Sequence, residues 1–233
     1  MVLDPRKRQK KLERRKAKDK QRKKALAIRN ADDARSQLAR YASAPVLHAC
    51  YTDSLWQKGI AQVLLSRQLT NGSVAFAAFL VDVYCLGVKN AMSGVVTRQR
   101  YREEILFKLR REHEFVHRSP EWIRKLVEDS VEYAGRFGLT PHPDYFMAKE
   151  IFGDIDASAC TEEFKFGQNG KPYYIAGPFE SPARSQEIVR LLSEHCGDGR
   201  FDYVVHLPLE ELAELEGLRL VRFGDESAER HEP

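Results

Sequence analysis

The sequence contains little cysteine and no long apolar run. Its four cysteines, Cys50, Cys85, Cys160 and Cys196, are far apart and form no CxxC pair, so we expect free thiols in a reducing cytoplasm. No stretch reaches the roughly 18 uncharged apolar residues of a membrane-spanning helix. The basic N-terminal residues are not followed by the apolar segment of a secretory signal. We therefore expect a soluble, cytoplasmic protein without membrane contact.

Motifs that identify a reaction are also missing from the sequence. There is no phosphate-binding loop, no GxGxxG and no GxSxG, so the commonest signatures of nucleotide-binding proteins and hydrolases are excluded. The close pairs of His and Cys, His48 with Cys50 and His195 with Cys196, lack the spacing of zinc ligands. We therefore predict no metal and no cofactor, and enzymatic activity is not favoured.

What the sequence does have is a strong separation of charge. The 233 residues have a formal net charge of +4. Residues 1–24 alone contain 13 Lys or Arg and 3 Asp or Glu, a net charge of +10, so the other 209 residues carry a net charge of −6. An acidic body repels a phosphate backbone and a basic arm attracts it. Contact with nucleic acid is therefore predicted to run through the arm.

The basic arm is the predicted nucleic-acid-binding element. Its cations can neutralise several phosphates without sequence preference, which favours RNA, ribosomes or DNA as partners. Residues 6–24 have no aromatic or leucine-rich face, so membrane insertion is not favoured. The sequence does not indicate an oligomeric state. The predicted binding residues are Arg6, Lys7, Arg8, Lys10, Lys11, Arg14, Arg15, Lys16, Lys18, Lys20, Arg22, Lys23 and Lys24.

A helix and a β-hairpin are predicted after the arm. Apolar residues recur at helical spacing in residues 25–44, and Pro45 ends this linking helix. Residues 60–69 and 73–88 are predicted to form a hairpin, because Asn71-Gly72 can supply the positive φ angles of a tight primed turn. Residues 74–88 are apolar on both faces, so we expect a central strand that is covered on both sides.

A second hairpin is predicted over residues 163–175, around the turn Gly167-Gln168-Asn169-Gly170, with Pro172 marking an edge strand. Ser119 and Ser181, each followed by proline, are typical helix starts. The remaining predicted elements are helices 101–113, 119–137, 144–152, 181–196 and 209–215, and strands 201–207 and 218–223.

The predicted fold class is α+β, a mainly antiparallel sheet built on two β-hairpins with covering helices, plus a basic helical or disordered N-terminal arm. The predicted organisation is a basic arm 1–24, a linking helix 25–44, an α+β domain 45–223 and a flexible tail 224–233.

Two stretches carry a resemblance to a known family: FLVDVYCLGVK, from Phe79 to Lys89, and FKFGQNGKPYYIAGP, from Phe164 to Pro178. They resemble an uncharacterised bacterial protein family that has no assigned activity. The resemblance covers roughly residues 45–207 and leaves the arm outside. It implies a self-standing domain, and it implies no catalytic residue.

Three residues are the candidates for chemistry. Asp82 is the only charge in the apolar stretch 74–88, so its carboxylate must be paired, hydrogen-bonded or protonated. It could be a metal-binding or general-base carboxylate, or it could accept bonds from Lys89, a histidine or backbone amides near a strand end. His142 and Asp144 lie between two predicted helices, where His and Asp often hold ligands. The structural alternative is a turn residue, His142, and a helix cap, Asp144.

The leading hypothesis is therefore non-catalytic binding of RNA, ribosome or DNA through the basic arm. One alternative is a metal-dependent, nuclease-like enzyme that uses Asp82 with His142 or Asp144. Another is a protein-interaction module whose arm recognises an acidic partner.

Overall fold

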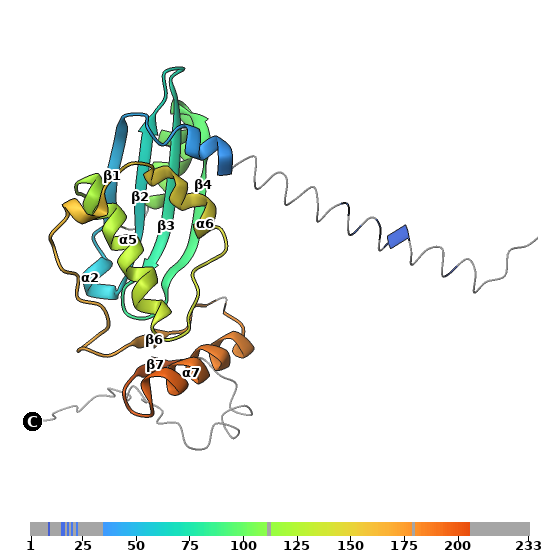
Figure 1. Ribbon diagram of the computed structural model, residues 1–233, viewed down its shortest axis with the longest axis vertical. Coiled ribbons are helices and arrows are strands. Elements are labelled where there is room, and N and C mark those ends of the chain that lie inside the picture. The colour runs from blue at the N-terminus through green and yellow to red at the C-terminus, as the bar shows by residue number, and fades with distance from the viewer. Residues whose placement is uncertain are drawn as a thin grey trace, which may run out of the picture.

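The computed structural model describes residues 35–110, 113–178 and 180–205, together with six single positions between residues 9 and 22. The fold is α+β, with a five-stranded antiparallel sheet and helices (Figure 1). The spatial order of the strands is β4-β3-β2-β1-β5. Their bounds are β1 Val46–Thr52, β2 Ile60–Gln68, β3 Ser73–Asp82, β4 Gly87–Thr97 and β5 Phe115–His117.

The predicted first hairpin is formed by β2 and β3, which pair from Ile60–Asp82 to Gln68–Val74. Its turn differs from the expectation. Only Gly72 has a positive φ, 81°, whereas a primed turn needs a positive φ at Asn71 as well. The Gly72 N–H donates to the Leu69 carbonyl, and the Asn71 side chain accepts from the Ser73 N–H. The loop is therefore longer than two residues, with glycine at its left-handed position.

The predicted strand 73–88 ends early, at Asp82. Residues 83–86 make a turn, and Gly87, with a φ of 65°, begins β4. The expected placement of the strand is confirmed, since β3 lies inside the sheet between β2 and β4. Both of its faces are covered, because Ala77 and Phe79 belong to one buried cluster whereas Phe76 and Ala78 belong to another.

Helix α5, Pro120–Gly135, covers one face of the sheet (Figure 1). It confirms the predicted helix 119–137, and the Ser119 hydroxyl caps it by accepting from the Trp122 N–H. Ile123, Leu126 and Val127 on its inner side are fully buried. The predicted helix 144–152 consists of α6, Tyr145–Ala148, and the 3₁₀ turn η2, Lys149–Phe152, on the same face.

The opposite face is covered by a helical segment made of α3 Arg98–Arg100, η1 Tyr101–Leu106 and α4 Phe107–Leu109. Buried Tyr101 and Ile105 pack there against the strands. This segment matches most of the predicted helix 101–113, but it begins three residues earlier. Two short elements complete the sheet side of the molecule, α2 Leu55–Lys58 and η3 Ala157–Ala159.

A small layer lies at the base of the sheet in Figure 1: β6 Tyr173–Ile175, α7 Pro182–Cys196 and β7 Asp202–Val204. Strands β6 and β7 pair in parallel. Helix α7 confirms the predicted helix 181–196, and Ser181 caps it by accepting from the Arg184 N–H. Ile188, Val189 and Leu192 bury its inner face. We call this unit the β6–α7–β7 layer.

The predicted second hairpin is wrong. Residues 163–166 form no strand, and only Gln168 and Lys171 form an isolated bridge. Phe164 and Phe166 instead pack against aromatic side chains of α5, Trp122 and Tyr133, at ring centroids of 5.0 and 5.1 Å. Their packing directs the segment over the helix rather than back along residues 171–175. Strand β6 consequently pairs with β7 and not with residues 163–166.

The linking helix is described only from residue 35. Residues 35–40 are helical, Leu38 belongs to the buried cluster between the sheet and its covering helices, and Arg35 forms an ion pair with Glu150 at 2.6 Å. Buried Arg67 donates to the carbonyls of Ala44, Ile151 and Phe152, which fixes the end of this linker. Predicted elements 209–215 and 218–223, the tail 224–233 and nearly all of the arm lie outside the described residues. None of the described helices could cross a membrane.

Candidate functional site

Asp82 holds the turn between β3 and β4. Its Oδ1 accepts from the Tyr84 N–H at 3.0 Å and from the Cys85 N–H at 2.9 Å, and the residue is 6% exposed. The sequence-based expectation of a buried Asp82 with polar partners is confirmed, and the partners are the backbone amides near a strand end. The same turn contacts later parts of the chain, because the Val83 and Tyr84 carbonyls accept from Gly167 and Tyr173.

The electrostatics of Asp82 follow from its burial. Loss of solvent raises the pKa of its carboxyl group to about 6, against the opposing influence of Lys89 and of the backbone N–H groups. A raised pKa by itself is compatible with a functional acid and with a structural turn. The hydrogen bonds that the carboxylate accepts from two backbone N–H groups give Asp82 a structural role in the turn.

His142 and Asp144 lie beside the edge strand β4. The His142 N–H donates to the Val88 carbonyl at 2.9 Å, which fastens the loop after α5 to the sheet edge. The Asp144 N–H donates to Nδ1 of His142, and the Asp144 carboxylate lies 3.7 Å from the same nitrogen. The predicted capping by the Asp144 side chain is not made, since it accepts no bond from the first turn of α6.

The three candidate residues do not form a metal centre. Within the described part of the chain, no group of three or more His, Cys, Asp or Glu side chains could hold a metal ion. His142 lines a cavity that Asp82 and Asp144 do not line. These observations give the nuclease-like alternative no geometric support of its own.

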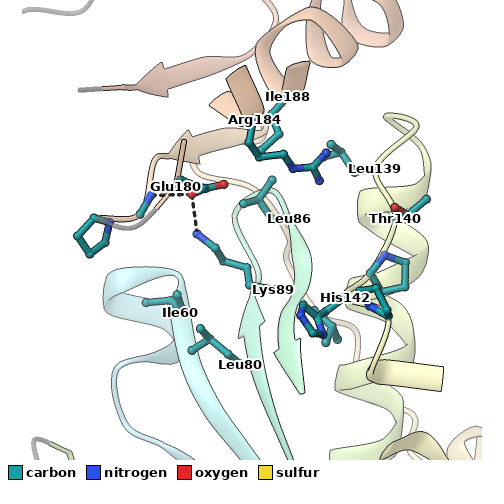
Figure 2. A pocket seen from close by; sticks show the side chains of 15 residues that line it. Ile60, Leu80, Leu86, Lys89, Leu139, Thr140, His142, Glu180, Arg184 and Ile188 are labelled. Carbon is teal, nitrogen blue, oxygen red and sulfur yellow. Dashed lines mark hydrogen bonds and ion pairs between the residues drawn. The ribbon is translucent and has the colours of Figure 1, made fainter. Parts of the chain in front are cut away.

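The cavity next to His142 has a volume of about 620 Å³ and lies where the sheet meets the β6–α7–β7 layer (Figure 2). Three parts of the chain build it: the ends of β2, β3 and β4, the loop after α5, and the segment from Gly177 into α7. Its size is that of pockets that enclose small organic ligands. The lining residues are Ile60, Leu80, Leu86, Val88, Lys89, Leu139, Thr140, Pro141, His142, Pro143, Gly177, Pro178, Glu180, Arg184 and Ile188.

The charged groups of the cavity are Lys89, Glu180 and Arg184. Nζ of Lys89 lies 3.6 Å from Oε2 of Glu180, and their side chains are only 17% and 18% exposed. The Gly177 N–H donates to the same Oε2 at 2.6 Å, which fixes the carboxylate. In Figure 2, Lys89 turns toward Glu180, whereas the Arg184 guanidinium extends toward Leu139 on the other side of Leu86.

Sequence reasoning missed this cavity. In the sequence, Lys89 is only a possible partner of Asp82, and neither Glu180 nor Arg184 lies in a recognisable motif. The only sequence signal is the pair of resembling stretches: the first contains Leu80, Leu86, Val88 and Lys89, and the second ends in Gly177-Pro178. The lining groups come from positions 60 to 188, so the sheet and the β6–α7–β7 layer must both be in place before the cavity exists.

A basic surface lies on the helical segment 98–110, on the sheet face opposite α5. Arg100 and Arg110 form ion pairs with glutamates four residues later. Within the described residues, Arg98, Arg102 and Lys108 have no acidic side chain within 4.0 Å, and all three are exposed. We call Arg98, Arg102 and Lys108 the basic helical surface.

The predicted cations of the arm are seen at a few positions. Those that the structure describes, all with exposed side chains, are Arg15, Lys16, Lys18, Lys20 and Arg22. The other eight predicted binding residues lie outside the described positions.

Comparisons of the chain with models of protein families, with curated proteins and with solved structures give no match in any of the three.

Proposed function

We propose that this protein binds RNA, ribosomes or DNA without catalysis, through the basic arm of residues 1–24. The observation that carries the proposal is the charge separation, +10 in the arm against −6 in the rest of the chain. Released counterions drive such binding, and each phosphate contact contributes without reading a base. The acidic body restricts productive contact to the parts of the chain that are basic.

The basic helical surface supports the proposal from the described part of the chain. Residues 98–110 contain five Lys or Arg and two Glu, a net charge of +3 inside a body whose total is −6. Arg98, Arg102 and Lys108 on this segment are exposed and free of close carboxylates within the described residues. A phosphate backbone that engages the arm can therefore find a second, weaker contact on the body.

A salt titration of binding tests this function. The full chain and a chain that begins at residue 25 are titrated with ribosomes, a mixed RNA and a duplex DNA. For Z phosphate contacts, log affinity falls against log salt with a slope of about −0.7Z to −0.9Z. We expect affinity to fall by orders of magnitude between about 50 and 200 mM salt, and the truncated chain to lose most of both the affinity and the slope.

A matched variant separates the two basic elements. The triple change Arg98→Gln, Arg102→Gln and Lys108→Gln in the full chain should reduce affinity far less than removal of the arm. Equal affinity of the full and truncated chains would refute binding through the arm. Failure of the full chain to bind any of the three ligands would favour the acidic partner protein, and metal-dependent cleavage of the RNA or DNA would favour the nuclease-like enzyme.

A further inference from the structure

We propose that the outer edge of β4 is an interaction surface, and that it pairs in antiparallel orientation with β4 of a second copy of this chain. This contact is separate from the binding of nucleic acid and does not involve the basic arm. Three features of the strand support it: outward-facing backbone groups, a length of edge without charge or proline, and a glycine at the centre of that length.

Strand β4 lies at one side of the sheet and pairs only with β3 (Figure 1). The Ala91 N–H faces away from β3, because it donates to Oδ1 of the neighbouring Asn90 at 2.8 Å. Backbone groups alternate in direction along an antiparallel strand, so Ser93 and Val95 also direct their N–H and C=O groups outward. Within the described residues, no hydrogen bond from outside the sheet reaches the backbone of Ser93 or Val95.

The composition of this edge does not protect it from pairing. Native sheets guard their edges with very short strands, charged side chains or proline. The opposite edge strand, β5, has only three residues and is followed by Arg118. Strand β4 has 11 residues, and residues 90–97 contain neither a charge nor a proline, whereas Met92 is 46% exposed. An edge of this kind is a template for a further strand.

The sequence of β4 fits a second copy of itself. Around a two-fold axis at Gly94, Ser93 would exchange backbone hydrogen bonds with the partner's Val95, and Gly94 would face the partner's Gly94 without hydrogen bonds. Side chains approach most closely in such a pair, and glycine presents none. The exposed Met92 would cover the partner's Val96. No like charges oppose one another along residues 90–97.

The two ends of β4 favour this register over its neighbours. The strand ends at Thr97, which would lie opposite the partner's Ala91. The pairing then stops before Val88, whose carbonyl already accepts from the His142 N–H. A shift of the second strand toward Val88 would bring it onto the loop that carries His142. A shift in the other direction would leave Ala91 without a pairing partner.

Sedimentation of the full-length protein at several concentrations, in about 150 and 500 mM salt, tests the association. The higher salt screens charge contacts and releases nucleic acid from the arm, so an RNA bridge between two arms is not taken for a dimer. The contact is one strand wide, so we expect a dimer that dissociates on dilution and persists at the higher salt.

Variants at Ser93 test the role of the outward backbone groups. Ser93→Pro should weaken dimerisation about tenfold or more, because it removes an outward N–H from each copy. Proline is tolerated where the N–H of an edge strand faces solvent, so the sheet itself should still form. Ser93→Ala keeps the N–H and is the matched control, which should dimerise as strongly as the unsubstituted protein.

Cysteine cross-linking tests the register independently. Gly94→Cys should form an intermolecular disulfide under mild oxidation, because residues in a pair without hydrogen bonds lie within disulfide reach. A Cβ atom at Gly94 would meet only Cε1 of Phe76, at 3.8 Å, so the monomer accommodates the side chain. Thr97→Cys is the matched control, since two such residues would lie about 20 Å apart along the paired strands. The unsubstituted protein gives the background from Cys160 and Cys196, which are partly exposed.

Three outcomes would overturn the proposal. The first is a monomer at every concentration, and the second is a dimer that is lost at the higher salt or is unchanged in Ser93→Pro. The third is equal cross-linking of Gly94→Cys and Thr97→Cys, which would place the contact elsewhere. None of these results bears on the binding of nucleic acid through the arm.

Discussion

The five-stranded sheet and the β6–α7–β7 layer are built on different scales. The sheet contains strands of up to 11 residues, each paired with a neighbour in antiparallel register, and two buried clusters cover its faces. The layer has strands of 3 residues, paired in parallel, and a single buried cluster. Parallel pairing of short strands gains little by itself. The layer therefore depends on α7 and on its contacts with the sheet side.

The junction between these regions is the β3–β4 turn. Cys85 and Leu86 of this turn belong to the buried cluster of the layer, although they follow a strand of the sheet. Asp82 fixes the turn from the sheet side. Hydrogen bonds such as that from the Tyr173 N–H to the Tyr84 carbonyl tie the layer to this turn, so opening of the layer would break them and leave the strand pairing of the sheet intact. We therefore predict that the sheet sets the global stability and that the layer opens locally.

The largest expected effect comes from truncation of a core side chain in the sheet. Phe79 is fully buried and stacks on Phe152 at a centroid distance of 5.5 Å. Phe79→Ala should lower the free energy of unfolding by about 3–5 kcal/mol, measured by urea denaturation. Phe146→Ala, at a half-exposed phenylalanine, is the control and should change it by less than about 0.5 kcal/mol.

The corresponding change in the layer is Leu192→Ala. Leu192 is fully buried on α7, so the substitution should cost about 2–5 kcal/mol within the layer. If the layer opens locally, native-state hydrogen exchange will quicken at α7, β6 and β7 and stay unchanged at β2 and β3. Equal acceleration throughout both regions would show one cooperative unit and would contradict the comparison.

The features that could be predicted from the sequence are those that short-range signals determine. Ser119 and Ser181 each begin a helix and cap it in the structure, and Asn71-Gly72 lies in the turn of the first hairpin. These features depend on residues within a few positions of one another. The α+β class and the two-sided burial of β3 followed from the same local patterns.

Long-range pairing and the cavity could not be predicted in this way. Gly167-Gln168-Asn169-Gly170 contains good turn residues, but the pairing of β6 was decided by β7, about thirty residues later. Strand β5 has only three residues and no pattern of its own. The charges of the cavity come from a strand and from the segment that leads into α7, so no local motif joins Lys89 to Glu180 and Arg184.

A smaller effect, dependent on pH, is expected at the junction. Burial raises the pKa of the Asp82 carboxyl group to about 6 from its ordinary value of 3.8, so the folded protein prefers the protonated form. Its contribution to stability is therefore fully present below about pH 4 and is lost as the pH rises through about 6. Asp82→Asn does not titrate, and its Oδ1 can still accept the two amide bonds.

The measurement is the difference in unfolding free energy between Asp82→Asn and the unsubstituted protein from pH 4 to 7. Relative to the unsubstituted protein, the Asn variant should gain about 2–3 kcal/mol of stability between pH 4 and pH 7. Asp82→Ala is the control, because it loses the amide bonds at every pH. A difference that does not change with pH would show that Asp82 is ionised throughout and that the junction tolerates its charge.

The smallest effects separate two tyrosines that lie side by side in the layer. Tyr174 of β6 and Tyr203 of β7 are register partners, and both are buried. The Tyr174 hydroxyl donates to Oγ of Ser185 at 2.9 Å, which ties β6 to α7. The buried Tyr203 hydroxyl has no hydrogen-bond partner within the described part of the chain. Removal of the Tyr174 hydroxyl group should therefore lower stability, whereas removal of the Tyr203 hydroxyl group should not.

Tyr174→Phe should lower the stability of the layer by about 1 kcal/mol, because it breaks one hydrogen bond and leaves the Ser185 hydroxyl without that partner. Tyr203→Phe should be neutral or raise stability by about 1 kcal/mol, because it removes a desolvated hydroxyl group at almost constant shape. Hydrogen exchange of the α7 amide groups measures the effect of both substitutions on the stability of the same helix. A clear loss of stability in Tyr203→Phe would mean that its hydroxyl group has a partner in solution, and the layer would then be held more tightly than its short strands suggest.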